Sequence, residues 1–145
     1  MTVQQILDGK GREICSIQPD ATVFDALKLM SELEIGAVMV MDGQGGVHGI
    51  MSERDYARKI SLQGKSSHDT RVTEIMTPAE RMHTVAPHNT VEDCMVLMTA
   101  KQVRHLPVFE GKRFVGLFSI GDVVRAIISE KQSLIDQLST YIDKF

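Results

Sequence analysis

Apolar and polar positions follow one pattern along the chain, and the pattern occurs twice. In each copy, an apolar stripe with helical spacing precedes two short apolar runs and then a second helical stripe. Turns that contain glycine separate the two apolar runs, so each pair of runs is expected to form a β-hairpin. Each copy therefore predicts the order strand, helix, strand, strand, helix.

The beginnings of the two copies align at a spacing of about 68 residues, which marks an internal repeat. The aligned segments are Ile17-Gln-Pro-Asp-Ala-Thr-Val-Phe-Asp-Ala-Leu-Lys-Leu-Met30 and Val85-Ala-Pro-His-Asn-Thr-Val-Glu-Asp-Cys-Met-Val-Leu-Met98. In both, a threonine (Thr22 or Thr90) precedes an aspartate by three residues, which is a capping box. The apolar stripes of these helices are Val23, Ala26, Leu27 and Met30, and Val91, Cys94, Met95 and Met98.

The hairpins are predicted over residues 37–41 and 47–51 in the first copy, and over 106–109 and 114–118 in the second. A second helix then begins at Ser52 or Ser119, again with an aspartate three residues later. We expect its apolar residues to point into the core; they are Tyr56 and Ile60 in the first copy and Val123, Val124, Ile127 and Ile128 in the second.

The expected fold class is α+β, with two tandem repeats that pack against each other with pseudo-two-fold symmetry into one compact module. The expected boundaries are 1–62 for the first repeat, 63–71 for a polar linker, 72–128 for the second repeat and 129–145 for a C-terminal helix. We expect this helix to pack on the module or on a second copy. The cleft between the repeats is the expected ligand site.

Charge and composition narrow the function classes. The chain has 16 Lys and Arg against 19 Asp and Glu, a net charge of −3, so it lacks the basic footprint typical of nucleic-acid binding. No segment predicts a signal peptide or a membrane span, so we expect a cytoplasmic location and no membrane partner. Cys15 and Cys94 lie among apolar residues, which indicates buried hydrophobes and predicts no disulfide framework or metal site.

Four sequence features carry a family resemblance: Glu74-Ile-Met-Thr77, Val103-Arg-His-Leu-Pro-Val108, Gly49-Ile-Met-Ser-Glu-Arg-Asp55 and Gly116-Leu-Phe-Ser-Ile-Gly-Asp122. In this order they resemble the paired CBS domains, or Bateman module, over about residues 3 to 128. The chain is similar to the short stand-alone bacterial members, which have no attached enzyme or channel. The resemblance implies an adenine nucleotide as ligand: AMP first, then ADP, ATP or NAD, and less often S-adenosylmethionine.

Two Ser-x-x-Asp sequences are the main candidates for ligand contacts. A helix N-terminus attracts phosphate through its free N–H groups, to which Ser52 and Ser119 add a hydroxyl. The carboxylates of Asp55 and Asp122 are suited to accept hydrogen bonds from the two hydroxyls of a ribose, the role that the family resemblance implies. The alternative is that both sequences are capping boxes and nothing more.

Basic residues are expected to contact the phosphates. The resemblance places Arg104 and His105 there, facing the nucleotide held by Ser52 and Asp55, so that each site draws on both repeats. Gly36 and Ala37 occupy the equivalent positions of the first repeat and carry no charge, so Arg54 is the candidate for the other pocket. The alternative for Arg104 and Arg54 is that each is a solvent-exposed surface charge. The alternative for His105 is that it is a buried, hydrogen-bonded histidine.

The resemblance also implies an adenine pocket made of main-chain groups and apolar walls. The corresponding residues are Ile14, Cys15 and Leu117 in one pocket, and Met82, His83 and Ile50 in the other. Thr22 and Asn89, with Thr90, lie in loops that touch ribose or phosphate in family members. The alternative for the apolar residues of the adenine pocket is core packing. The alternative for Thr22, Asn89 and Thr90 is helix capping.

Other functions are less well supported by the sequence. There is no HExxH, Cys-x-x-Cys, GxGxxG or Walker A sequence, so an enzyme is not expected. A ligand-free dimerisation scaffold stays an alternative, and nucleic-acid binding is the least favoured because the chain has two Tyr, five Phe and no Trp. We expect a homodimer that transmits nucleotide occupancy to an unidentified protein partner through a shift in population.

Overall fold

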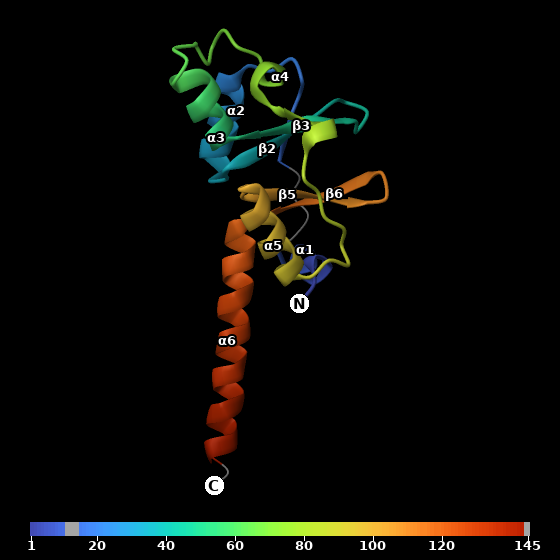
Figure 1. Ribbon diagram of the computed structural model, residues 1–145, viewed down its shortest axis with the longest axis vertical. Coiled ribbons are helices and arrows are strands. Elements are labelled where there is room, and N and C mark those ends of the chain that lie inside the picture. The colour runs from blue at the N-terminus through green and yellow to red at the C-terminus, as the bar shows by residue number, and fades with distance from the viewer. Residues whose placement is uncertain (11–14, 144–145) are drawn as a thin grey trace. The chain divides into compact units, whose positions relative to one another are not determined.

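The computed structural model describes residues 1–10 and 15–143. These residues form two compact units, one made of residues 1–10 with 83–143 and the other of residues 15–82. Each unit contains a two-stranded antiparallel hairpin with helices packed on it (Figure 1). The doubled pattern in the sequence is therefore visible as two similar structural units.

The first unit is built on the hairpin of β5 and β6. Its elements are α1 (Val3–Lys10), α5 (Val91–Lys101), β5 (His105–Glu110), β6 (Arg113–Ser119) and α6 (Ile120–Asp143). Its core gathers residues from all five elements, among them Leu7, Cys94, Leu106, Phe118 and Val123. Gly111, in the turn between the strands, has φ +63°, which glycine adopts without strain.

The second unit has a four-stranded sheet in the order β1-β2-β3-β4. Its elements are β1 (Ser16–Ile17), α2 (Val23–Leu33), β2 (Ala37–Met41), β3 (Val47–Ser52), α3 (Glu53–Tyr56), the π-helical turn η1 (Ala57–Ser61), α4 (Val72–Ile75), β4 (Thr77–Pro78) and the 3₁₀ turn η2 (Ala79–Arg81). Both predicted hairpins are thus confirmed; the first is longer by one residue than the apolar runs that predicted it, and the second by four.

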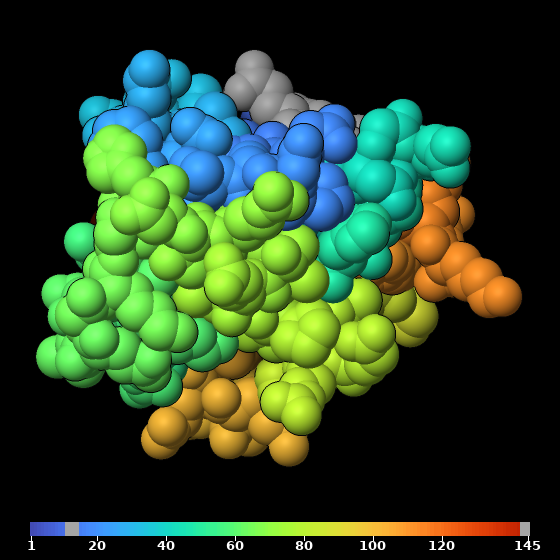
Figure 2. Space-filling model, turned by 90° about the horizontal axis from the view of Figure 1, so that it is seen from above, coloured from blue at the N-terminus to red at the C-terminus, as the bar shows by residue number. Residues whose placement is uncertain are grey.

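The segment that precedes each repeat in the sequence packs on the other repeat. In the first unit, the Val3 amide donates to the Asn89 carbonyl and the Val91 amide to the Met1 carbonyl. In the second unit, the matching bonds run from Val72 to Ala21 and from Val23 to Thr70. Figure 2 shows the segment around residues 71–82 (lime) beside the blue segment that leads into α2.

The last helix differs from the expectation. A second helix of the repeat and a separate C-terminal helix were predicted, but α6 is one continuous helix of 24 residues that extends away from its unit (Figure 1). Ser129 supplies no break because a single serine mid-helix costs little. Val124, Ile127 and Ile128 are exposed, so the prediction that they point into the core is wrong for these three, whereas Val123 is buried. Met95 on α5 is exposed as well.

Candidate functional site

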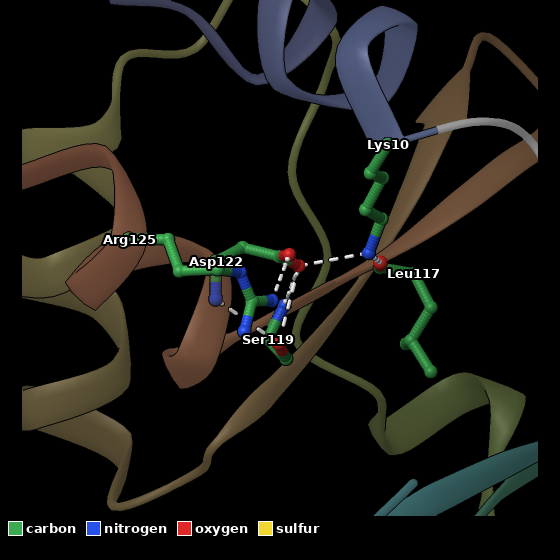
Figure 3. Close-up of polar contacts among 5 residues, drawn as sticks. All are labelled: Lys10, Leu117, Ser119, Asp122 and Arg125. Atoms are coloured by element: carbon green, nitrogen blue, oxygen red, sulfur yellow. Dashed lines mark hydrogen bonds and ion pairs between the residues drawn. The ribbon is translucent and has the colours of Figure 1, made fainter. Parts of the chain in front are cut away.

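Asp122 is the centre of a polar cluster in the first unit (Figure 3). Its Oδ2 accepts hydrogen bonds from the Ser119 amide at 2.8 Å and from the Ser119 hydroxyl at 3.1 Å. The Lys10 ammonium, from the end of α1, donates to the same oxygen at 2.8 Å, and the Arg125 guanidinium donates to Oδ1 at 2.8 Å. Lys10 also donates to the carbonyl of Leu117 at 2.7 Å. The cluster joins three elements of the unit.

These contacts keep Asp122 ionised. Burial of the carboxyl opposes the charged form, but hydrogen bonds from Lys10, the Ser119 amide and Arg125, with the charge of Lys10, outweigh it. The pKa of Asp122 therefore lies below its ordinary value. A carboxylate that is buried yet charged is suited to accept hydrogen bonds from neutral hydroxyl groups.

Arg104 and His105 lie beside this cluster. His105 pairs with Ser119 across β5 and β6, and the Ile120 amide donates to the Arg104 carbonyl at 2.9 Å. The pKa of His105 lies below its ordinary value, mainly because the ring is buried. The charge of Asp122 raises this pKa, and the charges of Arg104 and Lys10 lower it further. The fold therefore favours the neutral imidazole of His105, with one ring nitrogen that can donate and one that can accept a hydrogen bond. Whether Arg104 and His105 also face a nucleotide on Asp55, as the resemblance implies, stays a prediction.

Ser52 and Asp55 repeat the geometry in the second unit. Asp55 Oδ2 accepts from the Ser52 amide at 2.9 Å and from the Ser52 hydroxyl at 3.1 Å. Lys59, one turn further along, lies 3.3 Å from Oδ1 and donates to the Ile75 carbonyl at 2.8 Å. Both Ser-x-x-Asp sequences are thus capping boxes. If Asp55 or Asp122 binds a ribose, the same carboxylate caps the helix and contacts the ligand.

The positions equivalent to Arg104 and His105 carry no charged side chain in the second unit. The Glu53 amide donates to the Gly36 carbonyl at 3.0 Å, and the buried Ala37 pairs with Ser52. Arg54 is half-buried on α3, the helix that follows Ser52. The two units therefore offer different charges next to their Ser-x-x-Asp sequences.

The residues expected around the adenine are partly placed by the structure. Leu117 on β6 and Ile50 on β3 are half-buried, each two residues before its serine. Cys15, Met82 and His83 are half-buried in segments outside the helices. Ile14 lies outside the described residues. The role of these residues in ligand binding stays a prediction.

Thr22 and Asn89 have structural partners. The Thr22 hydroxyl accepts from the Asp25 amide at 3.1 Å, which caps α2. Asn89 Oδ1 accepts from the Ala86 amide at 2.7 Å, and its side-chain amide donates to Asp93 at 3.3 Å. Thr90 caps α5 in the same way as Thr22 caps α2. The geometry agrees with the capping alternative for the two threonines, whereas Asn89 closes the turn that precedes α5.

Sequence reasoning missed Lys10 and Arg125. Arg125 lies three residues after Asp122 on one helix, a spacing at which side chains meet, so this pair was open to prediction. Lys10 carries no local signal, because it reaches Asp122 only through the packing of α1 on the second hairpin.

Comparison with known proteins gives the family. The sequence model of the CBS domain matches residues 11–62 and 72–129. The chain belongs to the CBS-domain family. It is 40% identical over 149 residues to the mitochondrial CBS domain-containing protein CBSX3 of Arabidopsis thaliana, covering 97% of this chain and 71% of that protein.

Solved structures of CBS-domain proteins share the fold. A CBS-domain protein from Burkholderia ambifaria is 47% identical, with a TM-score of 0.83 over 89% of this chain and 95% of that one. The hexameric CBS-CP12 protein from bloom-forming cyanobacteria is 31% identical, with a TM-score of 0.72 over 86% of this chain and 69% of that one. The resemblance and the α+β fold predicted from sequence are therefore confirmed.

Family membership sets the general function. Tandem CBS domains generally bind adenosine ligands in regulation, and CBS-domain proteins are generally non-catalytic. In agreement with this, burial, with a smaller effect of Asp93, raises the pKa of the Cys94 thiol to about 11, so this cysteine is a core side chain and not a nucleophile at neutral pH. None of the helices in residues 1–10 and 15–143 combines the length and hydrophobicity that crossing a bilayer requires.

Proposed function

We propose that this CBS-domain protein is a non-catalytic sensor that binds an adenine nucleotide, with AMP favoured over ADP, ATP or NAD. The observation that carries the proposal is the Ser-x-x-Asp constellation, which the two units repeat with the same hydrogen bonds. In each, the helix cap fixes a carboxylate, and this carboxylate is the proposed acceptor for the ribose hydroxyls. Ile50 and Leu117, half-buried and close in sequence to the serines, supply apolar surface for the base.

Cationic groups near Asp122 support an anionic ligand. The exposed residues Lys10 and Arg125 contact the carboxylate of Asp122, and Arg104, also exposed, precedes His105, which pairs with Ser119. Phosphate is bound by such groups through charge and hydrogen bonds together. In the proposed signal, the nucleotide-bound protein and the nucleotide-free protein favour different conformations. A protein partner binds one of these conformations more tightly than the other.

A thermal-shift screen tests the proposal. The purified protein is heated with AMP, ADP, ATP, NAD, NADH or S-adenosylmethionine, each at the same concentration. A ligand present at 100 times its dissociation constant stabilises the folded state by about 2.7 kcal/mol, which raises the melting temperature by several degrees. A selective rise with AMP is expected. No shift with any of the six ligands favours the ligand-free scaffold instead.

We also propose that the protein is a homodimer held by α6. Exposed apolar residues recur on this helix at steps of four and three, with one step of seven between Ile127 and Leu134: Ile120, Val124, Ile127, Leu134, Leu138 and Tyr141. This spacing is typical of a helix that packs along another helix. Lys131 continues the stripe, and Glu130 beside it offers the opposite charge when two copies pair in register. This surface is also the observation that favours the scaffold as a second candidate function.

Light scattering after size-exclusion chromatography tests the dimer. Leu134→Glu with Leu138→Glu places two charges in the stripe and is expected to give a monomer. Ser129→Glu with Ser133→Glu adds the same charge on another face of α6 and is expected to leave the dimer intact. A wild-type protein that is a strict monomer, or a dimer that survives the leucine substitutions, contradicts the proposal.

A further inference from the structure

The Oδ2 oxygen of Asp122 has no acceptor position left for a ligand. A carboxylate offers about four acceptor positions. These are about two on each oxygen, and in the structure Oδ2 accepts from three donors, the Ser119 amide, the Ser119 hydroxyl and Lys10, while Oδ1 accepts from Arg125. The side chain of Asp122 is only 2% exposed. Ribose hydroxyls therefore have to replace one of these donors.

Lys10 is the donor that a ligand is best placed to replace. The two Ser119 donors belong to the helix cap, and Arg125 engages the other oxygen, Oδ1, from an adjacent turn of α6. Lys10 comes from a different element, it shares the saturated Oδ2 with the two Ser119 donors, and it holds the Leu117 carbonyl as well as Asp122 (Figure 3). It thus covers both the expected ribose acceptor and a main-chain group next to the expected adenine wall.

The second unit has no equivalent of this contact among the described residues. When α1 is aligned with α4 through the matching bonds of Val3 and Val72, Ala79 stands where Lys10 stands. Asp55 is 14% exposed, and its cation, Lys59, comes from the same helical segment at 3.3 Å. The carboxylate of Asp55 is therefore more open than that of Asp122.

We propose that Lys10 is an internal competitor for the ligand of the Ser119–Asp122 site. A nucleoside binds there only by displacing the Lys10 ammonium, which frees the C-terminal end of α1. This inference rests on the proposed function and adds a regulation of the same site. It makes the two sites unequal and couples one of them to the N-terminal helix, because a ligand shifts the equilibrium toward the state in which Lys10 has left.

Calorimetric titration with adenosine tests the competition, because adenosine has the ribose and the base but no phosphate for Lys10 to bind. Asp55→Asn provides the background, so that the Ser119–Asp122 site is measured alone. Adding Lys10→Met removes the ammonium and keeps the aliphatic chain, and adenosine is expected to bind roughly three- to tenfold more tightly. Lys101→Met, an exposed lysine on α5, is the matched control and is expected to leave the affinity unchanged.

Each result distinguishes this inference from the proposed function. If the Asp55→Asn protein binds adenosine and Lys10→Met leaves the affinity unchanged or weakens it, the competitor is excluded and the nucleotide site stands. If neither the wild type nor the variants bind adenosine or any nucleotide, both proposals fail. Hydrogen–deuterium exchange on the wild type needs no variant: adenosine is expected to increase exchange at the end of α1, and unchanged or slower exchange there contradicts the inference.

Discussion

Gly49 and Gly116 occupy equivalent positions in the two hairpins, and both face the segment that precedes the other repeat. A Cβ at Gly49 would lie 2.3 Å from the Thr77 carbonyl oxygen and 2.8 Å from Met76 Sδ. A Cβ at Gly116 would lie 2.9 Å from Leu7 Cδ2, the end of a side chain that can rotate. The two glycines are therefore required for close packing, to different degrees.

We predict that Gly49→Ala destabilises the protein more than Gly116→Ala. The main chain at Thr77 cannot move aside without loss of the β3–β4 pairing, and overpacking of this kind costs about 1–3 kcal/mol. Urea unfolding of both variants, followed by circular dichroism, measures the two free energies. Equal effects, or a larger effect at Gly116, contradict this explanation.

His105 predicts a pH dependence of stability. Since its pKa in the folded state lies below the ordinary value of 6.5, the unfolded chain binds this proton more readily. As the pH falls below about 6.5, the histidine therefore lowers the free energy of unfolding, until the pH passes its folded-state pKa. We predict that His105→Gln removes this part of the decline. The melting temperatures of the wild type and of His105→Gln, measured from pH 8 to pH 5, test this prediction. If the melting temperatures of the two proteins fall in parallel over this range, the prediction is contradicted.

At the scale of elements, local chemistry explains what the sequence predicted. Thr22, Ser52 and Thr90 begin helices as expected, because each capping box needs only a hydroxyl and a carboxylate three residues apart. The hairpin turns follow from glycine in the same way. Contacts between distant segments, such as the packing of α1 and the bond from Lys10 to Asp122, have no such local signal, so they required the structure.

The extent of α6 was mispredicted for a related reason. The apolar spacing from Ile120 to Ile142 is continuous, but it was divided at the end of the repeat, and the residues Val124, Ile127 and Ile128 were assigned to the core. Periodicity shows that a helical face is apolar and does not show what covers it. The exposure of these side chains is the information that the sequence lacked.

Helix α1 contributes to the core of its unit although it is far away in sequence. Val3 and Leu7 are buried against residues of α5, β5 and β6. We predict that Leu7→Ala destabilises the protein by about 2–5 kcal/mol, as expected for a leucine removed from a core. Leu62→Ala, at an exposed leucine outside α6, is the matched control, with an expected cost below 1 kcal/mol. Similar costs at both sites, measured by urea unfolding, contradict the assignment of α1 to this core.

At the scale of the whole molecule, the repeat explains both the similarity and the difference of the two candidate sites. The same capping geometry presents Asp55 and Asp122, while the surrounding charges differ because Lys10 and His105 have no counterpart in the second unit. The sequence predicted the two carboxylates and their unequal surroundings. It did not identify Lys10, because the basic residue that it proposes for the Ser119–Asp122 pocket is Arg54.

The most direct test of the central claim is calorimetric titration of AMP into the wild type and into the double variant Asp55→Ala with Asp122→Ala. Circular dichroism and a melting curve verify that the variant is folded, which is expected because both carboxylates lie at helix ends. The account predicts saturable binding to the wild type and no measurable binding to the variant, since both ribose acceptors are gone. Undiminished affinity in the folded double variant contradicts the assignment of the Ser-x-x-Asp sequences as the nucleotide site.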